Sequence, residues 1–205
     1  HQYRAGDCEY GIQCFLKKTP GTGPGEFPPG RREENKKRDI ICELGVIDFQ
    51  NFINLPDSYR LIPFSPAHFY LYDYSKIERA SFAAFPGYLD WLTAQSQIGP
   101  SATAMRGGEC VMSFGLVPLL PGVLELWMLR GSGLRHHGRP FLRSARQFFD
   151  ALGTVPDLRR VQFTVHTQNF AGVRFAEWLN FDIEGTLRQL LPGGSDAVQM
   201  SRIYN

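Results

Sequence analysis

Residues 165–185 read VHTQNFAGVRFAEWLNFDIEG, and this stretch predicts a strand, a capped helix and a second strand. Asn169 stands at the expected start of the helix, where its side-chain oxygen can accept a hydrogen bond from a free backbone N–H group. Asn180 follows the helix, and Asn tolerates the left-handed conformation that ends many helices better than any residue except Gly. We expect Phe181 to pack beneath the helix as the chain turns into the second strand.

The sequence on either side extends this unit into one domain over residues 59–205. Apolar runs with strand or helix periodicity alternate there with Gly- and Pro-containing turns. Helices are expected over 65–85, 88–92, 140–152 and 169–179. Strands are expected over 59–63, 102–105, 110–119, 123–129, 161–166, 182–191 and 197–204. The order β-α-α-β-β-β-α-β-α-β-β predicts an α+β domain.

Residues 1–58 differ in composition and are expected to form an extended N-terminal arm. Eight of the eleven residues in 20–30 are Gly or Pro, which disfavours regular structure, and residues 31–38 carry five bases and two acids. The arm is either a solvated linker or a segment that binds a protein partner or another copy of the chain. Apolar residues that could anchor it are Phe15, Ile40, Ile41, Val46, Ile47, Phe49, Phe52 and Ile53.

The composition disfavours several classes of protein. The chain has 205 residues, and its 22 basic and 20 acidic side chains give a net charge of +2, which disfavours a general attraction to nucleic acid or an anionic membrane. No apolar run approaches the roughly 20 residues that span a bilayer. Four cysteines are too few and too irregularly spaced for a disulfide framework or a zinc site. The start, HQYR, has neither Met nor a hydrophobic signal core, so we expect a processed chain or a fragment.

Residues 165–185 resemble a segment of the GNAT family of N-acetyltransferases. In that family a strand, an Asn, a helix and the pairs GF and EG follow one another, and Asn169 and Phe181 have the spacing that this pattern requires. The element order expected over 59–205 is similar to that of the family. The resemblance implies a central, mostly antiparallel mixed sheet of about seven strands flanked by about four helices, with acetyl-CoA as cofactor. Without the family, the same residues are an ordinary strand–helix–strand unit.

A second resemblance lies in residues 127–142, at the place of the family's pyrophosphate loop. The family pattern is Arg/Gln-x-x-Gly-x-Gly/Ala; Arg135 and Gly138 match it, whereas Pro140 stands at the last small residue and lacks an N–H. Residues 130–146 hold five arginines, two histidines and no acid, which suits either phosphate groups or a protein partner. The cofactor-binding residues that the resemblance implies are Leu129, Arg130, Arg135, His136, His137, Gly138, Arg139 and Asn169.

The sequence also resembles small acetyltransferase-like proteins of tailed bacteriophages. Residues 108–119 match their pattern Gly-Glu-x-x-x-x-Phe-Gly-x-x-Pro-Leu, Trp127 lies on the strand that follows, and residues 140–146 match Pro-Phe-Leu-Arg-x-x-Arg. The phosphate loop of that group also departs from the family pattern. The resemblance covers about residues 59–205 and leaves the arm unexplained.

Glu125 and His166 are the candidate catalytic residues. Acetyl transfer to an amine requires a base, and in the family this base is often a Glu on the strand to which Glu125 corresponds. Its apolar neighbours in the sequence would raise the pKa of this carboxyl; alternatively, Glu125 is the solvent-facing member of an alternating strand. His166 ends a strand near the expected substrate and is either a base or a partner for a loop carbonyl. Ala176 stands where the family commonly has a Tyr that protonates the thiolate.

Two functions follow from these patterns. The first is an acetyl-CoA-dependent N-acyltransferase of GNAT type that transfers the acetyl group directly to an amine. The second is a catalytically silent GNAT-fold structural or assembly protein, such as a component of a phage particle. No metal site is expected, because adjacent residues such as His136 and His137 point apart. The protein is expected in the cytoplasm, or in the virion if the second function holds.

Overall fold

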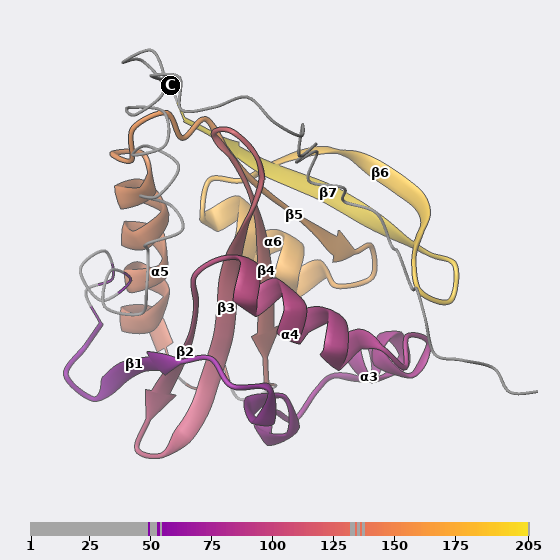
Figure 1. The fold of residues 1–205 in the computed structure, drawn as a ribbon, viewed down its shortest axis with the longest axis horizontal. Helices are drawn as coiled ribbons and strands as arrows, with labels where there is room; N and C mark the ends of the chain where they lie inside the picture. The colour runs from indigo at the N-terminus through magenta and orange to yellow at the C-terminus, as the bar shows by residue number, and fades with distance from the viewer. Residues whose placement is uncertain are drawn as a thin grey trace, which may run out of the picture.

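A seven-stranded sheet with the order β1-β2-β3-β4-β5-β7-β6 organises the chain (Figure 1). The structure is a computed structural model that describes residues 49, 53, 55–131, 134, 136 and 138–204, with the backbone alone for 138–141. The strands are β1 (Tyr59–Pro63), β2 (Ser101–Arg106), β3 (Glu109–Leu120), β4 (Val123–Arg130), β5 (Arg160–His166), β6 (Asp182–Leu191) and β7 (Ser195–Ile203). The helices are the 3-10 helix η1 (Pro66–Leu71), α3 (Lys76–Ala83), α4 (Tyr88–Ile98), α5 (Gly138–Leu152) and α6 (Phe170–Trp178).

These elements confirm the predicted α+β class and the mixed, mostly antiparallel sheet. The described strands β4 and β5 pair in parallel, and every other described pair is antiparallel. Among the described residues, no helix has both the length and the apolar character needed to cross a bilayer.

The prediction of one continuous helix over residues 65–85 is wrong, because this segment forms two separate helices, η1 and α3. Tyr72 and Tyr74, which lie between them, are both buried in the core. Ser75 then starts a new helix with a capping box: its Oγ accepts from the N–H of Glu78 at 3.3 Å, and Glu78 accepts from the N–H of Ser75 at 2.8 Å. Extended backbone between the two helices lets both rings reach the core.

Side chains of the central strands alternate between two apolar cores, one on each face of the sheet. On β4, Leu124 and Leu126 belong to the core that includes residues of α5 and α6, whereas Trp127 and Leu129 belong to the core that includes Leu92 of α4. Figure 1 accordingly shows α4 and α6 on opposite faces of the sheet. Burial on both faces gives the central strands their largely apolar sequences.

Two residues of the predicted arm pack into the core on the α5 face. Phe49 is 1% exposed, and its ring lies 5.3 Å from that of Phe114 and 5.5 Å from that of Phe148. Ile53 is buried in the same cluster. Both residues therefore belong to the core of the domain itself. Residues 1–48 lie outside the described residues, and the binding of a partner by the arm stays a prediction.

A buried chain of hydrogen bonds on the opposite face ties η1 to β2 and β3. Nδ1 of His68 accepts from the N–H of Ser65 and lies 2.8 Å from Oγ1 of Thr103. The Ser113 hydroxyl lies 2.7 Å from Thr103 Oγ1 and 2.7 Å from the Tyr72 hydroxyl. Because the N–H of Ser65 can only donate, Nδ1 is the acceptor, so Thr103 donates to His68, Ser113 to Thr103 and Tyr72 to Ser113.

The strand–helix–strand unit of residues 165–185 is confirmed. Asn169 caps α6, because its Oδ1 accepts from the N–H of Gly172 at 3.0 Å. Asn180 has a φ of 63°, the left-handed conformation expected after the helix. Phe181 is 1% exposed, and its ring lies 5.0 Å from that of Phe149 and 5.1 Å from that of Phe163.

Phe181→Ala should lower the free energy of unfolding by roughly 3–5 kcal/mol, because it removes a ring that fills the space between α5 and β5. Urea denaturation measures this change. Phe170→Ala is the matched control, since Phe170 is 67% exposed and should change the free energy little. A loss below about 1 kcal/mol for Phe181→Ala would contradict its place in the core.

Candidate functional site

Strands β4 and β5 pair over three positions and then diverge. The last register pair joins Glu125 to Gln162. Beyond it, β4 continues to Arg130 and β5 to His166 with no pairing between the two described strands, and Figure 1 shows them separating. The facing edges of both strands therefore keep backbone N–H and C=O groups without a strand partner in the described part of the chain.

Glu125 lies at the position where this divergence begins. Its side chain is partly buried, and its Oε2 accepts a hydrogen bond from Nε2 of Gln162 at 3.0 Å. Burial raises the pKa of Glu125 above its ordinary value of 4.5, and the Gln162 hydrogen bond and the Arg160 charge offset only part of that rise. A half-buried carboxylate of this kind can act as a general base. The catalytic role of Glu125 stays a prediction.

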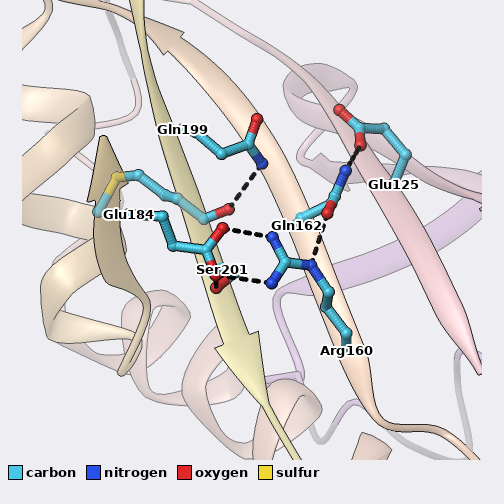
Figure 2. A network of polar contacts seen from close by, with 7 residues as sticks. Glu125, Arg160, Gln162, Glu184, Gln199 and Ser201 are labelled. Atoms are coloured by element: carbon cyan, nitrogen blue, oxygen red, sulfur yellow. Dashed lines mark hydrogen bonds and ion pairs between the residues drawn. The ribbon is translucent and has the colours of Figure 1, made fainter. Parts of the chain in front are cut away.

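Glu125 is the end of a network of polar side chains from β5, β6 and β7 (Figure 2). Nε of Arg160 donates to Oε1 of Gln162 at 2.5 Å, and the two terminal nitrogens of Arg160 donate to the two carboxylate oxygens of Glu184. The Ser201 hydroxyl also donates to Glu184, at 2.7 Å. The hydrogen bonds from Arg160 and Ser201 lower the pKa of Glu184 to about 2.

Arg130 connects the far ends of the diverging strands. Its guanidinium donates to Oδ1 of Asn169 at 3.2 Å and lies 3.9 Å from a carboxylate oxygen of Glu78 on α3. The same Oδ1 caps α6. Two of the predicted cofactor-binding residues, Arg130 and Asn169, are thus in direct contact, across the opening between β4 and β5.

The loop after β4 is described only in part. Arg135 and His137, both predicted to bind the cofactor, lie outside the described residues, whereas His136, also predicted to bind it, is exposed. Leu129 is 2% exposed and packs in the core, so its side chain is directed away from solvent. The described residues contain no group of three or more His, Cys, Asp or Glu that could hold a metal ion.

Gly138 and Arg139, both predicted to bind the cofactor, are the first two residues of helix α5, and their binding role stays a prediction. The first backbone N–H groups of a helix have no partner within it and can bind an anion. Pro140 is the third residue of α5 and lacks one of these donors. The start of α5 therefore offers one donor fewer than the family pattern does.

His166 holds the turn between β5 and α6. Its Nδ1 accepts from the N–H of Gln168 at 3.1 Å, and its carbonyl accepts from the N–H of Asn169 at 2.8 Å. The ring thus has a local structural contact, although with a backbone N–H rather than with the loop carbonyl that we considered. Its role as a base stays a prediction.

Sequence reasoning missed the polar residues that surround Glu125, namely Arg160, Gln162, Glu184 and Ser201. One signal was present: β5 carries Arg160, Gln162, Thr164 and His166 at every second position, although β5 pairs with neighbours on both sides. Such alternation in an internal strand indicates that one face of the sheet carries polar contacts. It does not reveal which residues of β6 and β7 complete them.

Comparisons with known proteins identify solved structures that have a similar fold. No family model and no curated protein matches the sequence. The structure is similar to an acetyltransferase of the GNAT family from Bacillus anthracis, with a TM-score of 0.55 at 12% identity over 74% of this chain and 98% of that one. It is also similar to the ribosomal L7/L12 alpha-N-protein acetyltransferase RimL in complex with coenzyme A, with a TM-score of 0.52 at 14% identity over 74% and 97%.

A third similar structure is that of yncA from Salmonella typhimurium with its cofactor acetyl-CoA. Its TM-score is 0.50 at 14% identity, over 73% of this chain and 95% of that one. The similarity spans nearly the whole of each of these proteins. The described chain therefore has the fold of the GNAT acetyltransferases.

Glu184→Gln should make the protein less stable at neutral pH, and the difference from the unmodified protein should shrink in acid. The folded-state pKa of Glu184, about 2, lies below the ordinary 4.5. Its charge therefore stabilises the fold fully above about pH 4.5 and progressively less as the pH falls towards 2. The effect is modest, because the Glu184 side chain is 38% exposed.

Urea denaturation at a series of pH values between 7 and about 2.5 measures the difference. Asp182→Asn is the matched control for the loss of a carboxylate on the same strand. A difference for Glu184→Gln that stays constant across this range would contradict the ion pair with Arg160.

Proposed function

We propose that the chain is an acetyl-CoA-dependent N-acyltransferase that passes the acetyl group directly to an amine. One observation carries the proposal: the half-buried carboxylate of Glu125 lies where β4 and β5 part, beside strand edges that have no strand partner among the described residues. The fold that the chain shares with GNAT acetyltransferases supports the same reaction class. We also propose that the protein is soluble and resides in the cytoplasm.

The residues at the opening fit acetyl-CoA. Beyond Glu125, the edge of β4 that faces β5 has no strand partner in the described part of the chain, and an extended ligand that carries amide groups can pair with it as an added strand pairs with a sheet. The N–H groups at the start of α5, less the one that Pro140 lacks, can bind phosphate oxygens. Arg130 and Asn169 lie at the mouth of the opening. When bound, acetyl-CoA supplies an acetyl group activated as a thioester.

Glu125 would accept the proton of the acceptor. An ammonium group of the acceptor would lose an N–H proton to the Glu125 carboxylate, and the nitrogen lone pair would then attack the thioester carbonyl carbon. A C–N bond would form as the C–S bond breaks, and the sulfur would leave as a thiolate that takes its proton from water. The raised pKa of Glu125 makes its carboxylate a stronger base than an exposed one. A covalent enzyme intermediate is disfavoured at Cys110, because the side chain is 8% exposed and burial raises the pKa of the thiol.

A second candidate function, a silent structural or assembly protein of a phage particle, is favoured by two observations. Pro140 removes one donor at the start of α5. Ala176 is 2% exposed within α6 and cannot protonate a leaving thiolate. Under this alternative the arm would bind other copies or another protein of the virion, and coenzyme A would not bind.

Acetyl-CoA should raise the melting temperature of the full chain, because a ligand at 100 times its Kd adds about 2.7 kcal/mol to the stability of the folded state. Differential scanning fluorimetry measures the shift, and calorimetry measures the Kd. Desulfo-coenzyme A, which lacks the sulfur, tests whether binding depends on the thioester group. Absence of binding by either method would remove the acyltransferase proposal and favour the structural alternative.

Glu125→Gln should lower kcat/KM for acetyl transfer by roughly 10²–10⁴-fold and leave acetyl-CoA affinity unchanged, because only the proton acceptor is lost. In the unmodified protein, kcat/KM should fall in acid with a midpoint above pH 4.5, since the pKa of Glu125 is raised above that value. Glu109→Gln, at an exposed carboxylate on β3, is the matched control. Full activity in Glu125→Gln would exclude Glu125 as the base.

A further inference from the structure

In the hydrogen-bonded chain that leads to Glu125, the chemistry of each group determines which atom donates and which accepts (Figure 2). The Arg160 guanidinium can only donate, so the atom of Gln162 that faces it is the oxygen Oε1, at 2.5 Å from Nε. The amide nitrogen of Gln162 then points to the other side. It donates to Oε2 of Glu125 at 3.0 Å. Gln162 therefore presents a donor to the carboxylate, and the amide cannot turn over without losing both hydrogen bonds.

Arg160 is itself held in place from β6 and β7. Both of its terminal nitrogens donate to Glu184, in a bidentate geometry that fixes the orientation of the guanidinium. Glu184 is oriented in turn by the Ser201 hydroxyl, and Ser201 is the register partner of Gln162 on β7. A continuous chain of contacts thus runs from β6 and β7 through β5 to the carboxylate on β4.

Within the described residues, Gln162 is the side chain that donates a hydrogen bond to the Glu125 carboxylate. On the other side of β4, the register partner of Glu125 is Val117 of β3, which is apolar and 5% exposed. Arg160 is the described charged group that acts on Glu125, and it does so through space. The hydrogen bond occupies Oε2, which leaves Oε1 available to a ligand.

We infer that Gln162 is a positioning residue for Glu125, with Arg160 and Glu184 setting the direction of its amide. Gln162 holds one carboxylate oxygen, so that the other can receive a proton from the acceptor, and its N–H stabilises the ionised form. The inference rests on the proposed function of Glu125 as the base. It adds residues of three further strands to the site.

The test compares the titration of Glu125 in the full-length protein and in three variants. Gln162→Met keeps the length of the side chain and removes both hydrogen bonds. Gln162→Glu still accepts from Arg160, but when ionised it cannot donate to Glu125 and it adds a negative charge. Gln199→Met is the matched control, because Gln199 lies on the same face on β7 and its amide contacts only the Met200 carbonyl at 3.5 Å among the described groups.

The carboxyl carbon of Glu125 is followed by NMR against pH and is assigned with Glu125→Gln. Loss of the N–H donor should raise the midpoint in Gln162→Met by about one pH unit, and the added charge should raise it further in Gln162→Glu. The midpoint in Gln199→Met should match that of the unmodified protein. Unchanged midpoints in both Gln162 variants, or an equal rise in Gln199→Met, would overturn the inference.

Kinetics provide an independent readout. The acid limb of kcat/KM should move with the NMR midpoint in each variant, and kcat should fall while the KM for acetyl-CoA stays constant. If the unmodified protein transfers no acetyl group to any amine, the proposed function fails. The NMR titration still decides in that case whether Gln162 controls the protonation of Glu125.

Discussion

The short parallel pairing between β4 and β5 is the constraint on which the candidate site depends. Parallel pairing ends at Glu125 and Gln162, so this pair is the last position where side chains of the two strands are held side by side. Beyond it the facing strand edges keep backbone groups that have no strand partner among the described residues, as the proposed binding of an extended ligand requires. A longer pairing would close the opening, and a shorter one would separate Glu125 from its hydrogen-bond donor.

The two apolar cores hold β4 in place where it diverges from β5. Beyond the last register pair, Leu126 is buried in the core that includes residues of α5 and α6 and Leu129 in the core on the opposite face, so the strand is anchored on both sides after it leaves β5. Phe181 anchors the β5 side of the sheet in a similar way, because its ring packs on residues of α5 and β5. Hydrophobic burial thus stabilises the positions of both strands beyond their last register pair.

Two polar chains in the molecule follow one physical rule. Each is directed by a group that can only donate: the backbone N–H of Ser65 in the chain that ends at Tyr72, and the guanidinium of Arg160 in the chain that ends at Glu125. Such a group decides the orientation of every amide or hydroxyl that follows. The first chain attaches η1 to the sheet, and the second gives Glu125 a donor in a partly buried setting.

The sequence by itself determined the local structure: the caps of α6, the alternation of the strands and the burial of Phe181 all follow from neighbours along the chain. Glu125 became a candidate through the family resemblance, because it lies on the strand where the family often has its base. Only the tertiary structure decided that η1 and α3 separate so that Tyr72 and Tyr74 are buried and that Phe49 joins the core. It also decided that Glu184, Arg160 and Gln162 form a chain of contacts that ends at Glu125. Alternation specifies the face on which a side chain lies, whereas its neighbours across strands depend on register and on where pairing ends, which are set by contacts between distant segments.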